Sequence, residues 1–410
     1  MSSAQDRELI GLRLGRNGDG RMKIVVATDS FKGSMTSLEA GNAVKRGILE
    51  VHPGWNVTVY PVADGGEGTV ESLTYRQAVT KRDCVVAGPL GERIEASYLW
   101  YEGGQEKTAV IEMAQAAGLP MVPEKLRNPL YTTTYGVGEM IRDAIDQGCR
   151  KFIIGIGGSA TNDAGVGMLQ ALGYHFRDEH GQEVSFGAAG LAKIEETGFD
   201  DVVEELADCR FQIACDVKNP LVGALGCSAV YGPQKGATEQ DIEVMDRWME
   251  RFADLVEQTA RQGESMLRPG GNRNTPGAGA AGGLGYAFLM FLGGVLRPGI
   301  DIVLDETGLA EEIAGADLVI TGEGRMDAQT LMGKTPAGVA GLARKHGIPV
   351  VAVAGCFGEG VAQCRESGLF RDCIAVDAIL SEQERAGAMN TQNAVRNLQE
   401  LVRQYFADRA

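Results

Sequence analysis

The sequence predicts an α/β protein of two domains, one of them built on a parallel sheet that helices cover on both faces. Continuous Val/Ile-rich runs alternate with stretches of helical period, as they do when both faces of a parallel sheet are buried. Residues 83–113 instead show short alternating strands and turns, which are typical of antiparallel hairpins and suggest an inserted second domain. The length of 410 residues is also large for a single domain.

Each apolar run bounded by turn residues gives an expected strand, and each stretch with a 3.6-residue period gives an expected helix. We interpret the glycine-rich segment 269–285 as the return crossing to the first domain, with 277–285 as hinge material. The expected strands are 23–27, 57–62, 151–155, 211–215, 317–321, 349–354 and 373–376. The expected helices are 36–51, 133–148, 163–173, 238–262, 336–346 and 386–406.

Composition restricts the classes of partner. The net charge of −16 argues against nucleic acid and against an anionic membrane surface. No apolar run approaches membrane-spanning length, and residues 1–21 lack the hydrophobic core of a signal peptide, so we expect a cytoplasmic protein with a disordered N-terminal tail. None of the eight cysteines forms a C-x-x-C pair, which agrees with reduced structural thiols.

Five expected strands run into a turn of small and polar residues, and a helix follows. Ligands of open α/β sheets bind beyond the carboxyl ends of the strands, where glycines let backbone amides approach anionic oxygens. A capping Asp or Ser explains any single turn equally well, but five turns with one layout favour a shared site. Block by block, the polar residues are Asp29, Ser30, Lys32 and Ser34; Asp64 and Glu67; Ser159, Thr161, Asn162 and Asp163; Asp216, Lys218 and Asn219; and Glu323, Arg325 and Asp327.

Carboxylates, lysines and glycine amides together suit a magnesium–nucleotide site and phosphoryl transfer, which depends mainly on positioning and charge neutralisation. The four histidines lie outside these blocks, which argues against a Ser-His-Asp hydrolase or a His-based zinc site. A dehydrogenase is weaker, because GIGGSA (155–160) matches G-x-G-x-x-A but lacks the acidic strand end expected about 20 residues later.

The segment VITGEGRMDAQTLMGKTPAGVA (319–340) contains Gly333-Lys334-Thr335, which looks like the end of a phosphate-binding loop. The P-loop pattern requires glycine at position 328, where this chain has alanine. We interpret the segment as a strand that turns at its glycines, delivers Glu323 and Arg325, and places Lys334 at the next helix start. A solvated surface lysine is the alternative reading of Lys334.

Eight segments resemble, in order, the signature segments of class I glycerate kinases: ATDSFKGSMTSLEA, PVADGGEGT, GPLG, GIGGSATNDAGVGMLQALG, CDVKNPL, YGPQKGAT, PGAGAAGGLG and ITGEGRMDAQTLMGKTP. The resemblance runs from Met22 to about the last expected helix. It implies a flavodoxin-like domain split into 22–66 and 287–410, an α/β domain inserted at 67–286, and an active-site cleft between them. It also implies ATP-dependent, magnesium-assisted phosphorylation of D-glycerate, usually on the 2-hydroxyl.

The resemblance gives the polar residues expected roles, which can be permuted among them. Asp163 or Asp29 would accept the hydroxyl proton, and Arg325 would pair with the substrate carboxylate. The predicted catalytic residues are Asp163, Lys32, Asp29 and Arg325; those binding ATP or phosphate are Ser30, Ser159, Lys218, Lys235, Gly322 and Lys334; and those binding Mg²⁺ are Asp64, Glu67, Asp216 and Glu323. The alternatives are a non-catalytic sensor of sugar acids or nucleotides on this fold, and a kinase that forms 3-phosphoglycerate. The sequence is compatible with an oligomer.

Overall fold

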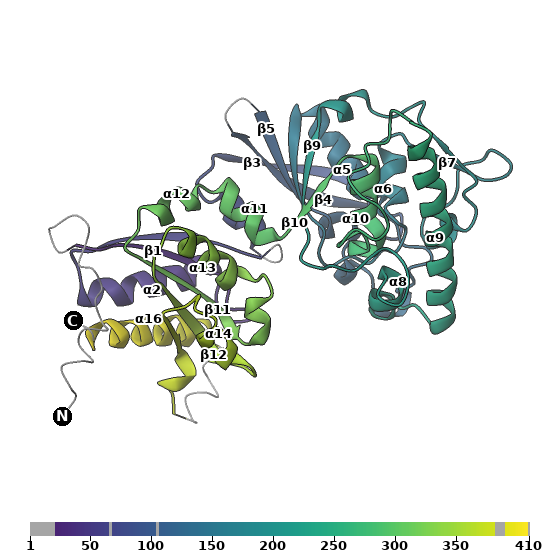
Figure 1. The fold of residues 1–410 in the computed structure, drawn as a ribbon. Helices are drawn as coiled ribbons and strands as arrows, with labels where there is room; N and C mark the ends of the chain where they lie inside the picture. The colour runs from purple at the N-terminus through teal and green to yellow at the C-terminus, as the bar shows by residue number, and fades with distance from the viewer. Residues whose placement is uncertain (1–20, 65–67, 104–105, 382–389, 409–410) are drawn as a thin grey trace. The chain divides into compact units, whose positions relative to one another are not determined.

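The computed structural model describes residues 21–64, 68–103, 106–381 and 390–408. The chain divides into two compact units: unit 1 consists of Met1–Arg76 and Ile300–Ala410, and unit 2 of Gln77–Gly299 (Figure 1). The sequence predicts domain boundaries at 66/67 and 286/287. The two units instead divide at 76/77 and 299/300, farther along the chain in both cases. The predicted tail up to residue 20 and the predicted metal ligand Glu67 lie outside the described residues. Among the described helices, none is both long and apolar enough to cross a membrane.

Unit 1 is built on a five-stranded sheet in which every neighbouring pair is parallel. Numbered along the unit and read from the opposite edge, the strand order is 2-1-3-4-5, which is the flavodoxin-like order. The predicted fold class is therefore confirmed, as are the unit's expected strands. In spatial order the strands are β13 (Asp372–Ala375), β12 (Val350–Phe357), β11 (Leu318–Met326), β1 (Lys23–Thr28) and β2 (Asn56–Pro61).

Helices cover both faces of this sheet (Figure 1). On one face, Ile24 and Val26 join a buried cluster with Ile48, Leu398 and Val402 from two helices near the ends of the chain. The first of these helices starts at a capping box formed by Thr36 and Glu39. The helices of unit 1 are α2 (Ser37–Val51), α3 (Thr69–Thr74), α11 (Gly299–Glu306), α12 (Leu309–Ala314), α13 (Thr335–Lys345), α14 (Val361–Glu366) and α16 (Thr391–Ala407), with short 3-10 helices η5 (Ala328–Leu331) and η6 (Val376–Ala378).

Strand β11 corrects one sequence expectation. The sequence predicts a turn at the glycines of GEGRM, but the strand continues through them to Met326. Its neighbours explain this, because Gly322 pairs with Thr28 on one side and with Val353 on the other. A side chain at position 322 would lie 2.2 Å from the Val353 carbonyl oxygen, so glycine allows the close approach of the strands there.

Unit 2 contains a six-stranded mixed sheet, in which the predicted hairpin region supplies the antiparallel strands. Its remaining neighbours pair in parallel, and among them the expected strands 151–155 and 211–215 pair with each other as the apolar runs predict. In spatial order the strands are β10 (Val295–Arg297), β9 (Arg210–Ala214), β6 (Cys149–Gly155), β5 (Glu106–Glu112), β4 (Arg93–Gly103) and β3 (Val79–Ala87), and β7 (His175–Arg177) pairs with β8 (Glu196–Gly198).

The helices of unit 2 pack on one large buried cluster, to which Phe152 and Phe211 of the sheet and Phe252 and Phe288 of the helices contribute. They are α4 (Ala114–Ala117), α5 (Tyr135–Asp146), α6 (Val166–Ala171), α7 (Ala188–Leu191), α8 (Cys227–Tyr231), α9 (Glu239–Arg261) and α10 (Ala280–Phe291), with short 3-10 helices η1 (Leu119–Met121), η2 (Glu124–Leu126), η3 (Glu204–Asp208) and η4 (Pro233–Lys235).

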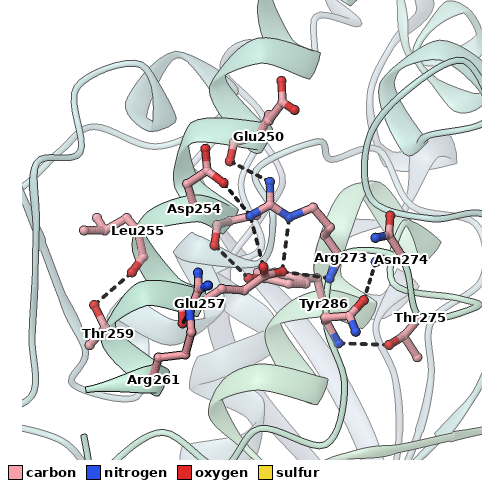
Figure 2. A network of polar contacts seen from close by, with 12 residues as sticks. Glu250, Asp254, Leu255, Glu257, Thr259, Arg261, Arg273, Asn274, Thr275 and Tyr286 are labelled. Atoms are coloured by element: carbon pink, nitrogen blue, oxygen red, sulfur yellow. Dashed lines mark hydrogen bonds and ion pairs between the residues drawn. The ribbon is translucent and has the colours of Figure 1, made fainter. Parts of the chain in front are cut away.

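The glycine-rich segment before α10 lies inside unit 2 and is anchored to α9. Figure 2 shows the Arg273 guanidinium between Asp254 (2.6 Å) and Glu257 (3.1 Å). Farther along, the Gly282 carbonyl accepts a hydrogen bond from Ala164 N (2.9 Å), and a side chain at Gly282 would lie 2.1 Å from the Thr161 carbonyl oxygen. The segment expected to be hinge material is thus packed against the loop that follows β6.

Candidate active site

A cavity of about 550 Å³ lies at the carboxyl end of the unit 1 sheet. In the 2-1-3-4-5 order the connections reverse direction between β1 and β11, and ligands of such sheets bind in the crevice at this point. Seven of the predicted site residues line this one cavity, together with Ser34 of the first polar block. The seven are Asp29, Ser30, Lys32, Asp64, Glu323, Arg325 and Lys334.

Asp29 follows β1 and is only 5% exposed. Its Oδ1 accepts a hydrogen bond from Ser30 N (2.6 Å), and its Oδ2 accepts one from Thr335 Oγ1 (2.8 Å) at the first residue of α13. Burial, reinforced by the neighbouring Asp64 carboxylate, raises the pKa of Asp29 to about 6. Asp29 is therefore a fixed carboxyl group that gains its charge not far below neutral pH.

Glu323 lies within β11 and is 8% exposed. Its Oε1 accepts a hydrogen bond from Thr330 Oγ1 (2.6 Å), and its Oε2 lies 3.8 Å from Lys334 Nζ. Burial raises the pKa of Glu323 to about 7, which the Thr330 and Lys334 contacts only partly oppose. A carboxyl group that titrates near neutral pH is well suited to act as a general base.

Arg325 stands two residues after Glu323 on the same strand, so the two side chains share a face of the sheet. Its side chain is 65% exposed, and its Nε lies 3.6 Å from Asp327 Oδ2. A side chain at Gly358 would come within 2.6 Å of Arg325 Nε. Glycine at 358 therefore leaves room for a guanidinium that remains accessible to an anion.

The donor set of this cavity fits a phosphate group with a magnesium ion. Lys32 and Lys334 supply positive charge, and the Ser30 hydroxyl is buried without a hydrogen-bond partner among the described residues. Carboxylate oxygens are the ligands that Mg²⁺ prefers, and Asp29 and Asp64 supply them side by side. Within the described ranges, no three His, Cys, Asp or Glu side chains form a preassembled metal cluster. Magnesium at phosphoryl-transfer sites is commonly held by one or two carboxylates and the substrate phosphates.

Asp163 lies in unit 2, not in this cavity, and is fully buried. Its oxygens accept hydrogen bonds from Thr134 N and Oγ1 (both 2.8 Å), Gly165 N (3.1 Å) and Gly167 N (3.3 Å). Burial raises the pKa of Asp163 against the effect of these donors. The carboxyl thus ties together the loop after β6 and the start of α5, and every one of these contacts is internal to unit 2.

Lys235 and Ser159 also lie together in unit 2. The Lys235 ammonium is 2% exposed and donates to Ser159 Oγ (2.8 Å) and to the Thr161 carbonyl oxygen (2.7 Å). Burial lowers the pKa of Lys235 to about 8. These two predicted phosphate ligands therefore contact each other, and Lys235 holds the loop that carries Ser159.

Of the remaining predicted residues, Asp216 and Lys218 lie apart from both groups, and Gly322 contacts the first group only through its backbone. Asp216 and Lys218 are exposed on the loop after β9, where Asp216 Oδ1 accepts a hydrogen bond from Gly299 N (3.1 Å). Gly322 lies inside β11, and its carbonyl oxygen accepts a hydrogen bond from Asp29 N (2.8 Å). Gly322 thus positions Asp29 through the backbone.

The sequence interpretation missed two threonines that hold the carboxylates, Thr330 and Thr335. The sequence did contain a signal for Thr335. It directly follows Lys334, which was already a candidate, and the start of one helix brings both residues to the same edge of the sheet. Thr330 follows Asp327 in a capping arrangement, in which Asp327 N donates a hydrogen bond to Thr330 Oγ1 (3.0 Å). The apolar wall of the cavity was also missed, because Val376, Leu380 and Ala394 are distant in sequence from the polar blocks.

Comparison with known families gives one match over nearly the whole chain: the model described as the glycerate kinase family matches residues 24–408. A Halalkalibacterium halodurans protein named glycerate kinase is 44% identical over 92% of this chain and 97% of its own length. A protein of Escherichia coli named glycerate 2-kinase is 42% identical over 92% of this chain and 97% of its own length.

A solved structure leads to the same family. A crystal structure from Salmonella typhimurium, classed as glycerate kinase 2, superposes with a TM-score of 0.82 and is 40% identical in sequence. The match covers 95% of this chain and 98% of that one.

Proposed function

The chain belongs to the glycerate kinase family and is a kinase enzyme, and from that premise we propose that it transfers the γ-phosphoryl group of ATP to the 2-hydroxyl of D-glycerate. The products would be 2-phospho-D-glycerate and ADP. The name of the Escherichia coli relative, glycerate 2-kinase, supports the choice of hydroxyl. The eight cysteines are free thiols, which supports a reducing compartment such as the cytoplasm as the site of the reaction.

The observation that carries the proposal is a group of four side chains at one edge of the sheet. Two are acids whose pKa values lie near neutral pH, Asp29 and Glu323, and two are lysines, Lys32 and Lys334. Glu323 and Lys334 lie 3.8 Å apart, which supports a base and a cation acting on the same reacting group. Glu323 would accept the proton of the glycerate hydroxyl as the oxygen attacks phosphorus, and Thr330 would keep its carboxylate oriented. This reassigns the base from Asp163, whose oxygens are all engaged inside unit 2.

Lys334 and Lys32 would stabilise the negative charge on the phosphate oxygens, and the buried Ser30 hydroxyl would donate to one of them. Asp29 and Asp64 would hold magnesium, which when bound would neutralise charge on the phosphates and align them. Thr335 would keep Asp29 in position through its hydrogen bond of 2.8 Å. A bound cation would also favour the ionised form of Asp29, whose pKa of about 6 already leaves it charged at neutral pH.

Arg325 would pair with the carboxylate of D-glycerate. Its guanidinium is largely exposed in the cavity wall and lies on the same strand face as Glu323. A guanidinium binds a carboxylate through two parallel hydrogen bonds, so it fixes the orientation of the acid as well as its position. The hydroxyl group would then be presented to Glu323 by the part of glycerate that does not react.

Release of ADP from purified protein, measured with D-glycerate and magnesium-ATP, tests the proposal. We expect glycerate-dependent turnover and, in the phosphorus NMR spectrum, a product phosphorylated on the 2-hydroxyl. A 3-phosphoglycerate product would correct the position of transfer. Measurable glycerate binding without ADP release would instead support the alternative of a non-catalytic sensor.

A further inference from the structure

The unit 1 cavity changes character along the sheet edge. At the carboxyl ends of β1 and β11 it is lined by charged groups. Lys334 Nζ lies 3.8 Å from Glu323 Oε2, and Asp29 is near enough to raise the pKa of Glu323. The next strands in space are β12 and then β13. Adjacent strands lie about 4.8 Å apart, so the end of β13 is roughly 14 Å from the end of β1.

The far end of the cavity is apolar. Val376 directly follows β13, Leu380 comes a few residues later, and Ala394 faces the cavity from α16. Met35 also lines the cavity, from the loop after β1, where the Met35 carbonyl oxygen accepts a hydrogen bond from Phe31 N (2.9 Å). Val376, Ala394 and Met35 belong to the buried cluster beneath α2 and α16, so this wall is supported from behind.

We propose that this apolar end is the base subsite of the nucleoside triphosphate, which therefore lies along the sheet edge with its phosphates at β1 and β11 and its base at β13. This inference rests on the proposed function and adds the direction in which the nucleotide binds. A nucleotide combines a flat, largely apolar base with a charged phosphate chain, and the cavity offers matching surfaces in one continuous space. D-glycerate is small and polar throughout, so it has no group that fits this wall.

Between the two ends stand Gly355 and Cys356 of β12. A side chain at Gly355 would lie 2.6 Å from the Gly324 carbonyl oxygen, so only glycine fits at this point of the cavity lining. The Cys356 thiol is half-buried in the wall at the same level. A nucleotide that spans the cavity would cover this thiol, whereas a phosphate chain alone, held at β1 and β11, would not.

The first experiment compares two ligands on the full chain by titration calorimetry: ADP, and inorganic tripolyphosphate, which has the phosphates but no base. Leu380→Asn makes the apolar wall polar without adding charge. It should weaken ADP binding on the order of tenfold and leave tripolyphosphate binding unchanged. Leu49→Asn is the matched control, because Leu49 is also a half-buried leucine packed on the same cluster but does not line the cavity.

Unchanged ADP affinity in Leu380→Asn, or an equal loss for both ligands, would overturn the base subsite. A second measurement needs no variant: alkylation of Cys356 by iodoacetamide, quantified by peptide mass spectrometry. With ADP at about ten times its Kd, labelling should slow about tenfold, and tripolyphosphate at the same saturation should not protect. Equal protection by both ligands, or by neither, would contradict the proposed orientation. Both measurements could give the expected results while the wild-type protein shows no glycerate-dependent turnover. That outcome would refute the proposed function and leave the base subsite standing.

Discussion

Replacing Glu323 with Gln should make the protein more stable and less active, with an effect on stability that depends on pH. Glutamine keeps the acceptor oxygen for Thr330 Oγ1, so the change removes mainly the buried charge. The pKa of Glu323 is raised from 4.5 to about 7, and burial is the largest cause. Such a shift, at about 1.4 kcal/mol for each pKa unit, corresponds to a cost of about 3 kcal/mol when the carboxyl is ionised.

The sign follows from proton binding. Because the folded state holds the Glu323 proton more tightly than the unfolded state, the wild-type protein loses stability as pH rises from about 4.5 to about 7. The Gln variant has no such loss. At pH 8 it should therefore exceed the wild type by up to about 3 kcal/mol, and at pH 5 by less than about 1 kcal/mol.

Melting temperatures at the two pH values measure this difference. For a unit of this size, 3 kcal/mol corresponds to an increase in Tm of roughly 6–12 °C at pH 8. Glu366→Gln, which removes an exposed carboxylate on α14, controls for the change in net charge. Turnover of Glu323→Gln should fall on the order of 100-fold or more, since the proposed base is gone. A stability difference that is the same at pH 5 and pH 8 would refute the electrostatic reasoning, and full turnover would refute the role of base.

Three further outcomes follow from contacts described above. Asp163→Asn should destabilise unit 2 by about 2 kcal/mol or more, because the amide N–H₂ would face groups that all donate, and a variant with wild-type Tm but no turnover would instead restore Asp163 as a candidate base. Arg273→Met should lower the free energy of unfolding by about 1–3 kcal/mol, because its contacts with Asp254 and Glu257 of α9 are lost. The control is Arg247→Met, an exposed position on α9 that should change stability little. Equal effects of the two changes in denaturant melts would count against the anchoring contact. Thr335→Val removes a hydrogen-bond donor that lowers the pKa of Asp29, so this pKa should rise. The acidic limb of the pH profile of kcat/KM should then move to higher pH. An unmoved limb would mean that Asp29 need not be charged.

The strands and their approximate ends could be predicted because buried parallel strands appear in the sequence as Val/Ile runs. The convergence of Asp29 and Glu323 could be predicted for the same reason, since the carboxyl ends of parallel strands share an edge. The short strands β10 and β7 could not, because three residues carry no periodicity. The continuation of β11 through GEGRM was hidden because glycines in a sequence indicate a turn unless the close neighbouring strands are known.

Residue roles were harder to predict than elements. Asp163 follows a glycine-rich turn just as Asp29 does, and sequence cannot distinguish a carboxyl saturated by internal donors from one that faces a cavity. The same holds for Lys235, whose burial depends on packing of η4 against the loop after β6. The apolar end of the cavity requires α16 to return beside α2 and η6, which is a long-range contact that no local pattern encodes.

The role of the unit 1 cavity in phosphoryl transfer is tested most directly by Lys334→Met. Lys334 caps the start of α13, and Lys345→Met at the last residue of the same helix is the control. Methionine keeps the aliphatic stem and removes the charge that would meet the transferring phosphate. Measured as ADP release from D-glycerate and magnesium-ATP, kcat/KM of Lys334→Met should fall on the order of 100-fold or more, with Tm retained and Lys345→Met at the wild-type rate. A Lys334→Met protein that turns over glycerate at the wild-type rate would contradict the assignment of this cavity as the site of transfer.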